Sequence, residues 1–159
     1  MATFAAKTST ATMAADPVFI DTNVLVAASV TAHPSHGVAS AYLARLEADG
    51  APACINGQIC REFLVVLTRQ PVEGRAFTTD EALAALGTWL SACVVFEENE
   101  SVLAELLELV RRHDVKGKQV HDANIVATMH ANGLARLATF NAADFARFED
   151  EIAVEALVS

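Results

Sequence analysis

The sequence predicts one α/β domain, built on a parallel sheet of four to five strands that helices cover on both faces. Short apolar runs alternate along the chain with segments of helical periodicity, many of them ten or more residues long, which is typical of β-α-β units. Of the 159 residues, 53% are hydrophobic and 19% charged, enough apolar material for one sizeable core. Neither an internal repeat nor a linker divides the chain, so we expect one domain over residues 17–159.

The first half of the chain is expected to form two strands and three helices. An apolar run follows Pro17, a helical segment ends at Gly50, and the next helix stops before Pro71, because glycine closes helices and proline cannot continue them. The expected elements are strands at 18–20 and 52–55, helices at 22–30, 35–49 and 58–69, and a loop at 73–77.

The second half repeats the alternation. We expect Thr79 to cap a helix whose first turn holds Asp80, since acids suit the positive end of a helix. The next helix is acidic at Glu100 and basic at Arg111, and the last one ends at Gly133. The expected elements are helices at 79–92, 99–113 and 119–132, strands at 93–96 and 135–139, and a fifth candidate strand at 152–156.

The charge of the chain argues against a general nucleic-acid binder. Lysine and arginine number 11 against 20 aspartates and glutamates, a formal net charge of −9, whereas nucleic-acid binders usually carry a basic footprint. Any such role therefore requires a local basic patch or bound cations.

The compartment is expected to be the cytoplasm. Three cysteines without C-x-x-C spacing favour neither a disulfide scaffold nor a zinc site. Residues 1–16 have no apolar run of signal-peptide length and are expected to form a flexible tail. A transit peptide is a weaker alternative, since the segment lacks arginine. No stretch is apolar enough for a membrane span.

Two carboxylates stand at positions where parallel α/β folds place their chemistry. Asp21 directly follows the first strand, although it also suits the N-cap of the next helix. Glu62 shares the predicted apolar stripe of its helix with Ile59, Phe63 and Val66. A carboxylate on such a face costs several kcal/mol unless it is paired or binds a metal. An ion pair with an arginine, or an edge position that reaches water, is the alternative for Glu62.

Two further acids extend this pattern. Asp122 heads the apolar face formed by Ile125 and its neighbours, though an acid in a first helical turn is common. Asn141 and Asp144 follow the fourth strand, where an Asx-turn is the alternative.

A parallel sheet brings these strand ends together at one edge. Carboxylates gathered in one cleft repel each other and raise each other's pKa unless divalent cations neutralise them. Oxygen ligands favour Mg²⁺ or Mn²⁺ over zinc, and such an ion activates water for phosphoryl displacement.

The acids lie in four short motifs that resemble, in order and spacing, the PIN domain, and the length resembles its VapC-type toxins. The motifs are Phe19 to Leu25, Cys60 to Phe63, His121 to Ala123, and Leu137 to Phe145. The resemblance spans about residues 17–156. It implies a three-layer α/β/α fold and an Mg²⁺-dependent ribonuclease, with Mn²⁺ as a substitute, inhibited by a small cognate antitoxin.

The same resemblance implies roles for the residues of the site. Asp21 and Asp122 are the expected metal ligands, and Glu62 completes the acidic site and positions the ion or the attacking water. Asp144 is the fourth expected catalytic acid, since Asn141 stands where many relatives have aspartate. The expected supporting residues are Thr22, Asn23, Thr139 and Asn141.

Basic residues just before Asp122 suggest a track for the RNA backbone. Four positive charges lie within eight residues, and we expect Lys116 and Lys118 to contact RNA, with Arg61 extending the track. The alternative is a helix end that cations stabilise. His121 is expected to have a surface or supporting role.

A homodimer is expected from the helix at 79–92. Its wide apolar stripe includes Leu83, Leu86 and Leu90, and PIN-domain relatives dimerise; packing onto the domain is the alternative.

Two other functions remain open at this point. An aspartyl-nucleophile phosphatase fits Asp21, but its usual companion acid is replaced by Asn23. A catalytically idle interaction module of the same fold is the other alternative. Mg²⁺-dependent RNA cleavage separates both from the ribonuclease.

Overall fold

The computed structural model describes residues 15–69 and 71–159, so most of the expected N-terminal tail lies outside the described residues. The strands are β1 (Val18–Ile20), β2 (Ala53–Asn56), β3 (Val94–Phe96), β4 (Arg136–Thr139) and β5 (Ala153–Ala156). The helices are α1 (Thr22–Ser29), α2 (His36–Asp49), α3 (Gly57–Arg69), α4 (Thr79–Ala92), α5 (Glu100–Arg112), α6 (Gln119–Ala131) and the 3₁₀ helix η1 (Ala142–Phe148).

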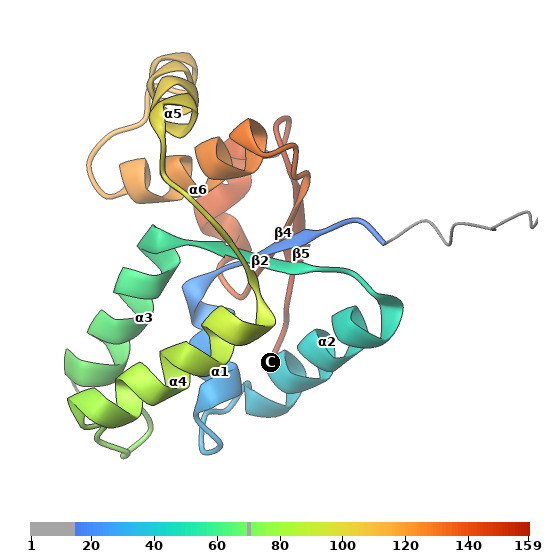
Figure 1. Ribbon diagram of the computed structural model, residues 1–159. Helices are drawn as coiled ribbons and strands as arrows, with labels where there is room; N and C mark the ends of the chain where they lie inside the picture. The colour runs from blue at the N-terminus through green and yellow to red at the C-terminus, as the bar shows by residue number, and fades with distance from the viewer. Residues whose placement is uncertain (1–14, 70) are drawn as a thin grey trace, which may run out of the picture.

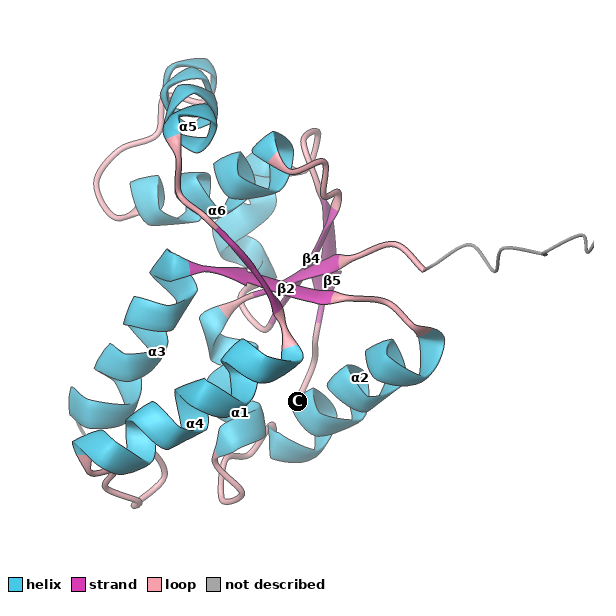
Figure 2. Ribbon diagram, viewed as in Figure 1, coloured by secondary structure: helices cyan, strands magenta, loops and turns pink. Residues whose placement is uncertain are grey.

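The five strands form one parallel sheet in the order β3-β2-β1-β4-β5 (Figure 1). Helices α1 to α4 lie on one side of this sheet, and α5 and α6 lie on the other (Figure 2). The expected α/β class, the parallel sheet and the helical layers are thus confirmed, and the candidate fifth strand at 152–156 forms as β5.

The direction of winding reverses at the centre of the sheet, between β1 and β4. From β1 the chain proceeds outward to β2 and β3, then crosses the sheet and returns beside β1 as β4. Ile20 is in register with Ala138, so the residues that follow these two strands emerge side by side. Ligand sites of open α/β sheets form at such reversal points.

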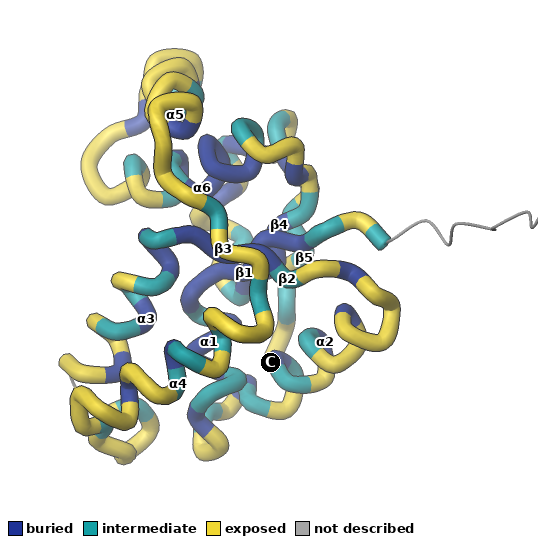
Figure 3. The backbone as a smooth tube through the Cα atoms, viewed as in Figure 1, coloured by how far each residue is buried: buried dark blue, intermediate teal, exposed yellow. Residues whose placement is uncertain are grey.

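The core is built around the buried central strands (Figure 3). All three residues of β1 are fully buried, whereas the edge strand β3 is largely exposed. Apolar runs without alternation are what a strand covered on both faces requires. The largest fully buried side chains include Phe19, Phe63, Phe145 and Phe148.

The start of α4 and the segment after β4 differ from the expectation. Thr78, and not Thr79, caps α4: its hydroxyl accepts a hydrogen bond from the Glu81 backbone, and the Glu81 carboxylate accepts one from the Thr78 backbone. This reciprocal capping box satisfies two backbone donors, so it outcompetes a cap one residue later. After β4 the chain forms η1, in which Asn141 makes no side-chain capping bond.

The stripe of α4 packs in part on its own domain. Ala82 and Leu86 are buried, and the Trp89 indole donates a hydrogen bond to Ser29 at 2.9 Å. Leu83 and Leu90 remain exposed, at 51% and 46%. No helix among the described residues is long and apolar enough to cross a membrane.

Candidate metal-dependent active site

Five elements bring the expected residues to one edge of the sheet. Asp21 follows β1, Glu62 lies in α3, Asp122 in the first turn of α6, and Asp144 in the first turn of η1 after β4. All four acids line one cleft of about 900 Å³. The expected supporting residues Thr22, Asn23 and Asn141 line the same cleft.

Asp21 is a metal-ligand candidate and a helix cap at once. Its Oδ1 accepts a 2.7 Å hydrogen bond from the Thr22 backbone, as an N-cap does. Its Oδ2 accepts bonds from the Thr139 hydroxyl at 2.6 Å and the Asn23 amide at 2.8 Å. The residue is only 8% exposed, and burial raises the pKa of its carboxyl, with the nearby Glu62 adding to the rise.

Asn23 and Thr139 form the frame that holds Asp21. The Asn23 amide nitrogen also contacts the Thr139 hydroxyl at 3.1 Å, and its oxygen accepts a bond from the Phe140 backbone at 3.1 Å. Thr139 is fully buried, and its hydroxyl accepts a bond from the Asn141 backbone at 2.9 Å. The strand ends of β1 and β4 are therefore joined through side chains around one carboxylate.

Glu62 faces the cleft and contacts both neighbouring elements. Its Oε2 accepts a 2.9 Å bond from the Thr22 hydroxyl, and its Oε1 accepts a 2.8 Å bond from the Gln58 amide. The predicted stripe of α3 was partly wrong, because Val66 is 40% exposed while Ile59, Phe63 and Leu67 are buried. Glu62 therefore lies on the flank of the helix that borders the cleft, away from the core.

Burial and the charges of the other acids both raise the pKa of Asp122. Its pKa rises from 3.8 to about 6, first because the carboxyl is partly buried, and then because Asp144, Asp21 and Glu62 repel its charged form. Asp144 is exposed on η1 and lines the same cleft as Asp122, and its charge adds most to this repulsion.

The donor set fits a hard divalent cation in chemistry and charge. The cleft holds four carboxylates, and among the described lysines and arginines Arg61 alone lines it. Negative charge of this kind is neutralised most directly by a bound cation. Across residues 15–69 and 71–159, however, no three acid, histidine or cysteine side chains already converge as a metal cluster. The fit thus rests on the donors and their mutual repulsion, with no preassembled coordination shell.

The expected RNA-contact residues fall in two places. Arg61 lines the cleft, and its guanidinium is held by Glu98 at 3.0 Å. Lys116 and Lys118 are exposed in the loop before α6 and do not line the cleft. Lys116 pairs with Asp114 at 2.6 Å, which lowers the charge available to a phosphate.

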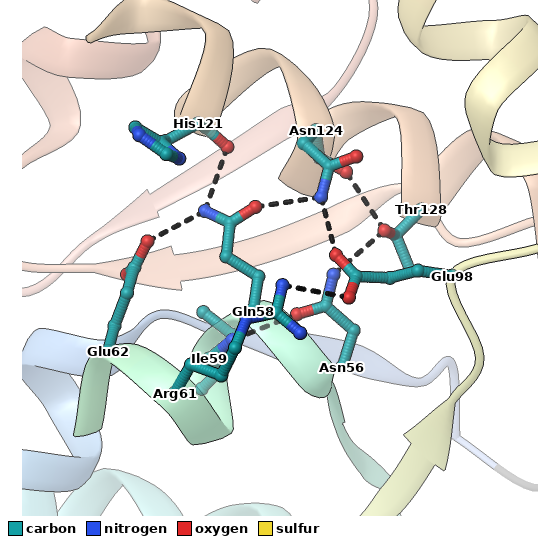
Figure 4. Close-up of polar contacts among 9 residues, drawn as sticks. All are labelled: Asn56, Gln58, Ile59, Arg61, Glu62, Glu98, His121, Asn124 and Thr128. Carbon is teal, nitrogen blue, oxygen red and sulfur yellow. Dashed lines mark hydrogen bonds and ion pairs between the residues drawn. The ribbon is translucent and has the colours of Figure 1, made fainter. Parts of the chain in front are cut away.

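Among the polar residues that line the cleft, Gln58 and Asn124 were not sequence candidates. Neither was Glu98, which bonds Asn124 and Arg61 beside the cleft. Gln58 precedes Glu62 by four residues, and Asn124 follows Asp122 by two. The spacing from Gln58 to Glu62 is a usable signal, because residues four apart share a helix face. Asn124 donates to Gln58 and to Glu98, both at 2.7 Å (Figure 4).

The α/β fold and its acidic cleft agree with the protein family that sequence comparison identifies. The PIN domain family matches residues 18–151, and the chain therefore belongs to the PIN domain family. No curated protein sequence matches the chain.

Among solved structures the chain is similar to toxins of the VapBC and FitAB toxin–antitoxin complexes. The structure of VapBC2 from Rickettsia felis, bound to a DNA fragment from its promoter, matches with a TM-score of 0.65 and 17% identity, covering 89% of this chain and 98% of that one. VapC20 from Mycobacterium tuberculosis, a toxin that cleaves the sarcin-ricin loop, matches with a TM-score of 0.57 and 24% identity, covering 76% and 86%. A toxin–antitoxin complex from Klebsiella pneumoniae matches at 0.58 and 22%, covering 81% and 90%. At these identities the likeness concerns the fold.

Proposed function

We propose that this protein is a metal-dependent endoribonuclease and the toxin of a toxin–antitoxin pair. The observation that carries the proposal is the convergence of four acids, from four separate elements of a PIN domain, on one cleft, where burial first and then the neighbouring negative charges raise the pKa of Asp21 and Asp122. A purely structural set of acids is paired with cations, whereas this one faces a single arginine among the described residues.

Asp21 and Asp122 are the residues that would hold Mg²⁺ or Mn²⁺. When bound, such an ion lowers the pKa of a coordinated water and stabilises the charge of a phosphoryl group in displacement. Thr139 and Asn23 keep the Asp21 carboxylate in one orientation, so it needs little reorganisation to act as a ligand.

The remaining groups act on water and on the RNA. Each Glu62 oxygen accepts one protein hydrogen bond, leaving further lone pairs to orient a water and accept its proton. Asp144 adds to the negative potential that attracts the cation. Arg61, on the rim of the cleft, contacts an RNA phosphate, while Lys116 and Lys118 attract the backbone from outside it.

Purified protein incubated with labelled RNA tests the activity. Cleavage is expected with Mg²⁺ or Mn²⁺ and not with a chelator, and Asp21→Asn and Asp122→Asn are expected to abolish it. Thr88→Ala is a matched control, since Thr88 lies on the exposed face of α4. Metal-independent cleavage, or full activity of Asp122→Asn, contradicts the mechanism. A folded wild type that binds a partner protein but cleaves no RNA supports the idle module, and a covalent phosphoprotein supports the phosphatase.

The toxin role rests on the structural neighbours, several of which were solved as VapBC and FitAB complexes. A short protein encoded beside this chain is expected to form a stable complex with it and to suppress cleavage. If the purified protein cleaves RNA but its expression in a bacterial host does not arrest growth, the proposed nuclease activity stands and the proposed toxin role is refuted.

A further inference from the structure

Gln58 links two parts of the acidic cleft through a single buried side chain (Figure 4). It lies in the first turn of α3 and is only 5% exposed. Its amide nitrogen donates to Glu62 Oε1 at 2.8 Å and to the His121 carbonyl at 3.0 Å. His121 immediately precedes Asp122, so this one amide ties a catalytic acid of α3 to the backbone beside a catalytic acid of α6.

The orientation of this amide is dictated by its partners. A carboxylate and a carbonyl only accept hydrogen bonds, so both require the nitrogen end of Gln58. The oxygen end accepts a 2.7 Å bond from the Asn124 amide, whose nitrogen also bonds Glu98. Turning the amide over would place oxygen against two acceptors and nitrogen against a donor. The side chain is therefore held in one state, with both ends satisfied.

This link matters because α3 and α6 share little direct packing within the described chain. Each helix packs mainly on other elements, α3 on α1 and α4 and α6 on α5. The separation of Glu62 from the start of α6 therefore depends on side chains that span the gap, and Gln58 contacts both sides of it.

We propose that Gln58 is a positioning residue, which holds Glu62 and the first turn of α6 at the separation that RNA cleavage requires. The inference rests on the proposed ribonuclease function and deepens it. Gln58 acts through Glu62, because its amide orients the carboxylate that receives the proton of the attacking water. It also acts through the His121 carbonyl, which fixes the start of α6 beside the proposed metal ligand Asp122.

A second buried bond in the same region provides a matched control. The Asn56 amide, at the end of β2, donates to the Thr128 hydroxyl of α6 at 2.9 Å. Both residues are fully buried and neither lines the cleft, and their side chains hydrogen-bond each other and backbone groups, with no bond to a carboxylate of the cleft. Thr128→Val changes the shape little; it removes this bond and the 2.9 Å bond that the Thr128 hydroxyl donates to the Asn124 backbone carbonyl within α6. A buried amide is left unpaired, so stability is expected to fall, while the bonds of the Gln58 and Asn124 side chains stay in place.

The experiment measures single-turnover cleavage of labelled RNA by the full chain. Gln58→Met keeps the length of the side chain and removes its hydrogen bonds. It is expected to lower the cleavage rate about 10- to 100-fold, with the concentration of RNA giving half-maximal rate changed less than threefold. Gln58→Glu keeps the shape but presents an acceptor to Glu62, so it is expected to be slower still. Thr128→Val is expected to melt at a lower temperature and to cleave within threefold of wild type.

A double-mutant cycle separates positioning from general support. Because Gln58 acts in part through Glu62, Gln58→Met is expected to slow cleavage less in the Glu62→Gln background than in the wild type, since the positioning of that carboxylate no longer matters there. If the two losses multiply, the proposal is overturned.

Metal affinity supplies the second readout if Glu62→Gln lies below detection. The rise in melting temperature with Mn²⁺ then gives the dissociation constant, which is expected to weaken about tenfold in Gln58→Met and to stay unchanged in Thr128→Val. Equal constants for Gln58→Met and wild type overturn the inference in that case. A wild type that does not cleave RNA refutes the proposed function itself, whereas an active wild type with a normal Gln58→Met refutes only the role of Gln58.

Discussion

Replacing Asp122 by asparagine tests whether burial and the neighbouring acids together disfavour a negative charge at this position. The change keeps the shape of the side chain and removes one charge from a group of four. In the absence of metal we expect Asp122→Asn to be more stable than the wild type at neutral pH, which is the reverse of the usual effect of a substitution at a half-buried site.

The expected size follows from the raised pKa. The pKa of Asp122 lies near 6 in the folded chain, against 3.8 for an unperturbed aspartate. Two units correspond to at most about 3 kcal/mol, and because the carboxyl is half-exposed, screening by solvent reduces this to about 1–2 kcal/mol. For a chain of this size that is a rise of roughly 3–6 °C in melting temperature.

The pH dependence has a definite sign. A carboxyl with a raised pKa binds more protons in the folded than in the unfolded state between about pH 4 and 6. Its favourable contribution is therefore present below pH 4 and is lost as the pH rises through 6. The advantage of Asp122→Asn is expected to be full at pH 7.5 and mostly gone at pH 4.

Urea unfolding with a chelator, at pH 4 and pH 7.5, measures the difference in stability between Asp122→Asn and the wild type at each pH. Asp49→Asn is the control for net charge, because Asp49 is exposed at the end of α2 and does not line the cleft. Adding Mn²⁺ at a hundredfold excess over its dissociation constant is expected to stabilise the wild type by about 2.7 kcal/mol. The wild type is then expected to be more stable than Asp122→Asn. If Asp122→Asn is less stable than wild type without metal at pH 7.5, burial and the neighbouring acids do not disfavour the charge of Asp122 as argued, and the case for a cation site fails.

Three other predictions concern RNA, oligomeric state and the fourth acid. Replacing Lys116 and Lys118 by alanine is expected to weaken RNA binding for all sequences and to flatten its salt dependence. If a binding titration gives an unchanged salt slope, these lysines do not contact RNA. The protein is expected to be a homodimer that Leu83→Glu weakens, and light scattering that shows a monomer at tens of micromolar opposes this. Asp144→Ala is expected to slow cleavage more than Asn141→Ala, because Asp144 adds to the negative potential that attracts the cation. Equal cleavage rates for the two variants would show that Asp144 has no such role.

Much of the fold was predictable because its signals are local. The buried run at Val18–Ile20 and the alternation of strands with helices are properties of neighbouring residues, and they led to the parallel sheet. The cap of α4 was placed one residue late, since Thr78 and Thr79 look alike until the reciprocal bonds with Glu81 are seen.

The candidate site was predictable only as a set of positions. Carboxyl ends of parallel strands share an edge, so the residues at the ends of β1 and β4 were expected to lie close together. Asp21, which follows β1, accepts a bond from Thr139, the last residue of β4. The stripe of α3 was misjudged at Val66, because periodicity shows which residues share a face and not which part of that face borders an open cleft.

The sequence by itself thus determined the class of fold and which acids stand at the strand ends, since both follow from local pattern and chain direction. Tertiary structure alone decided how those acids are held. Asn23 and Thr139 meet across 116 residues of chain, and Gln58 reaches a carbonyl 63 residues away. Such bonds depend on how layers pack around the sheet. No spacing along the chain encodes the 3.1 Å between the side chains of Asn23 and Thr139, or the 2.7 Å between those of Asn124 and Gln58, because each pair comes from different elements.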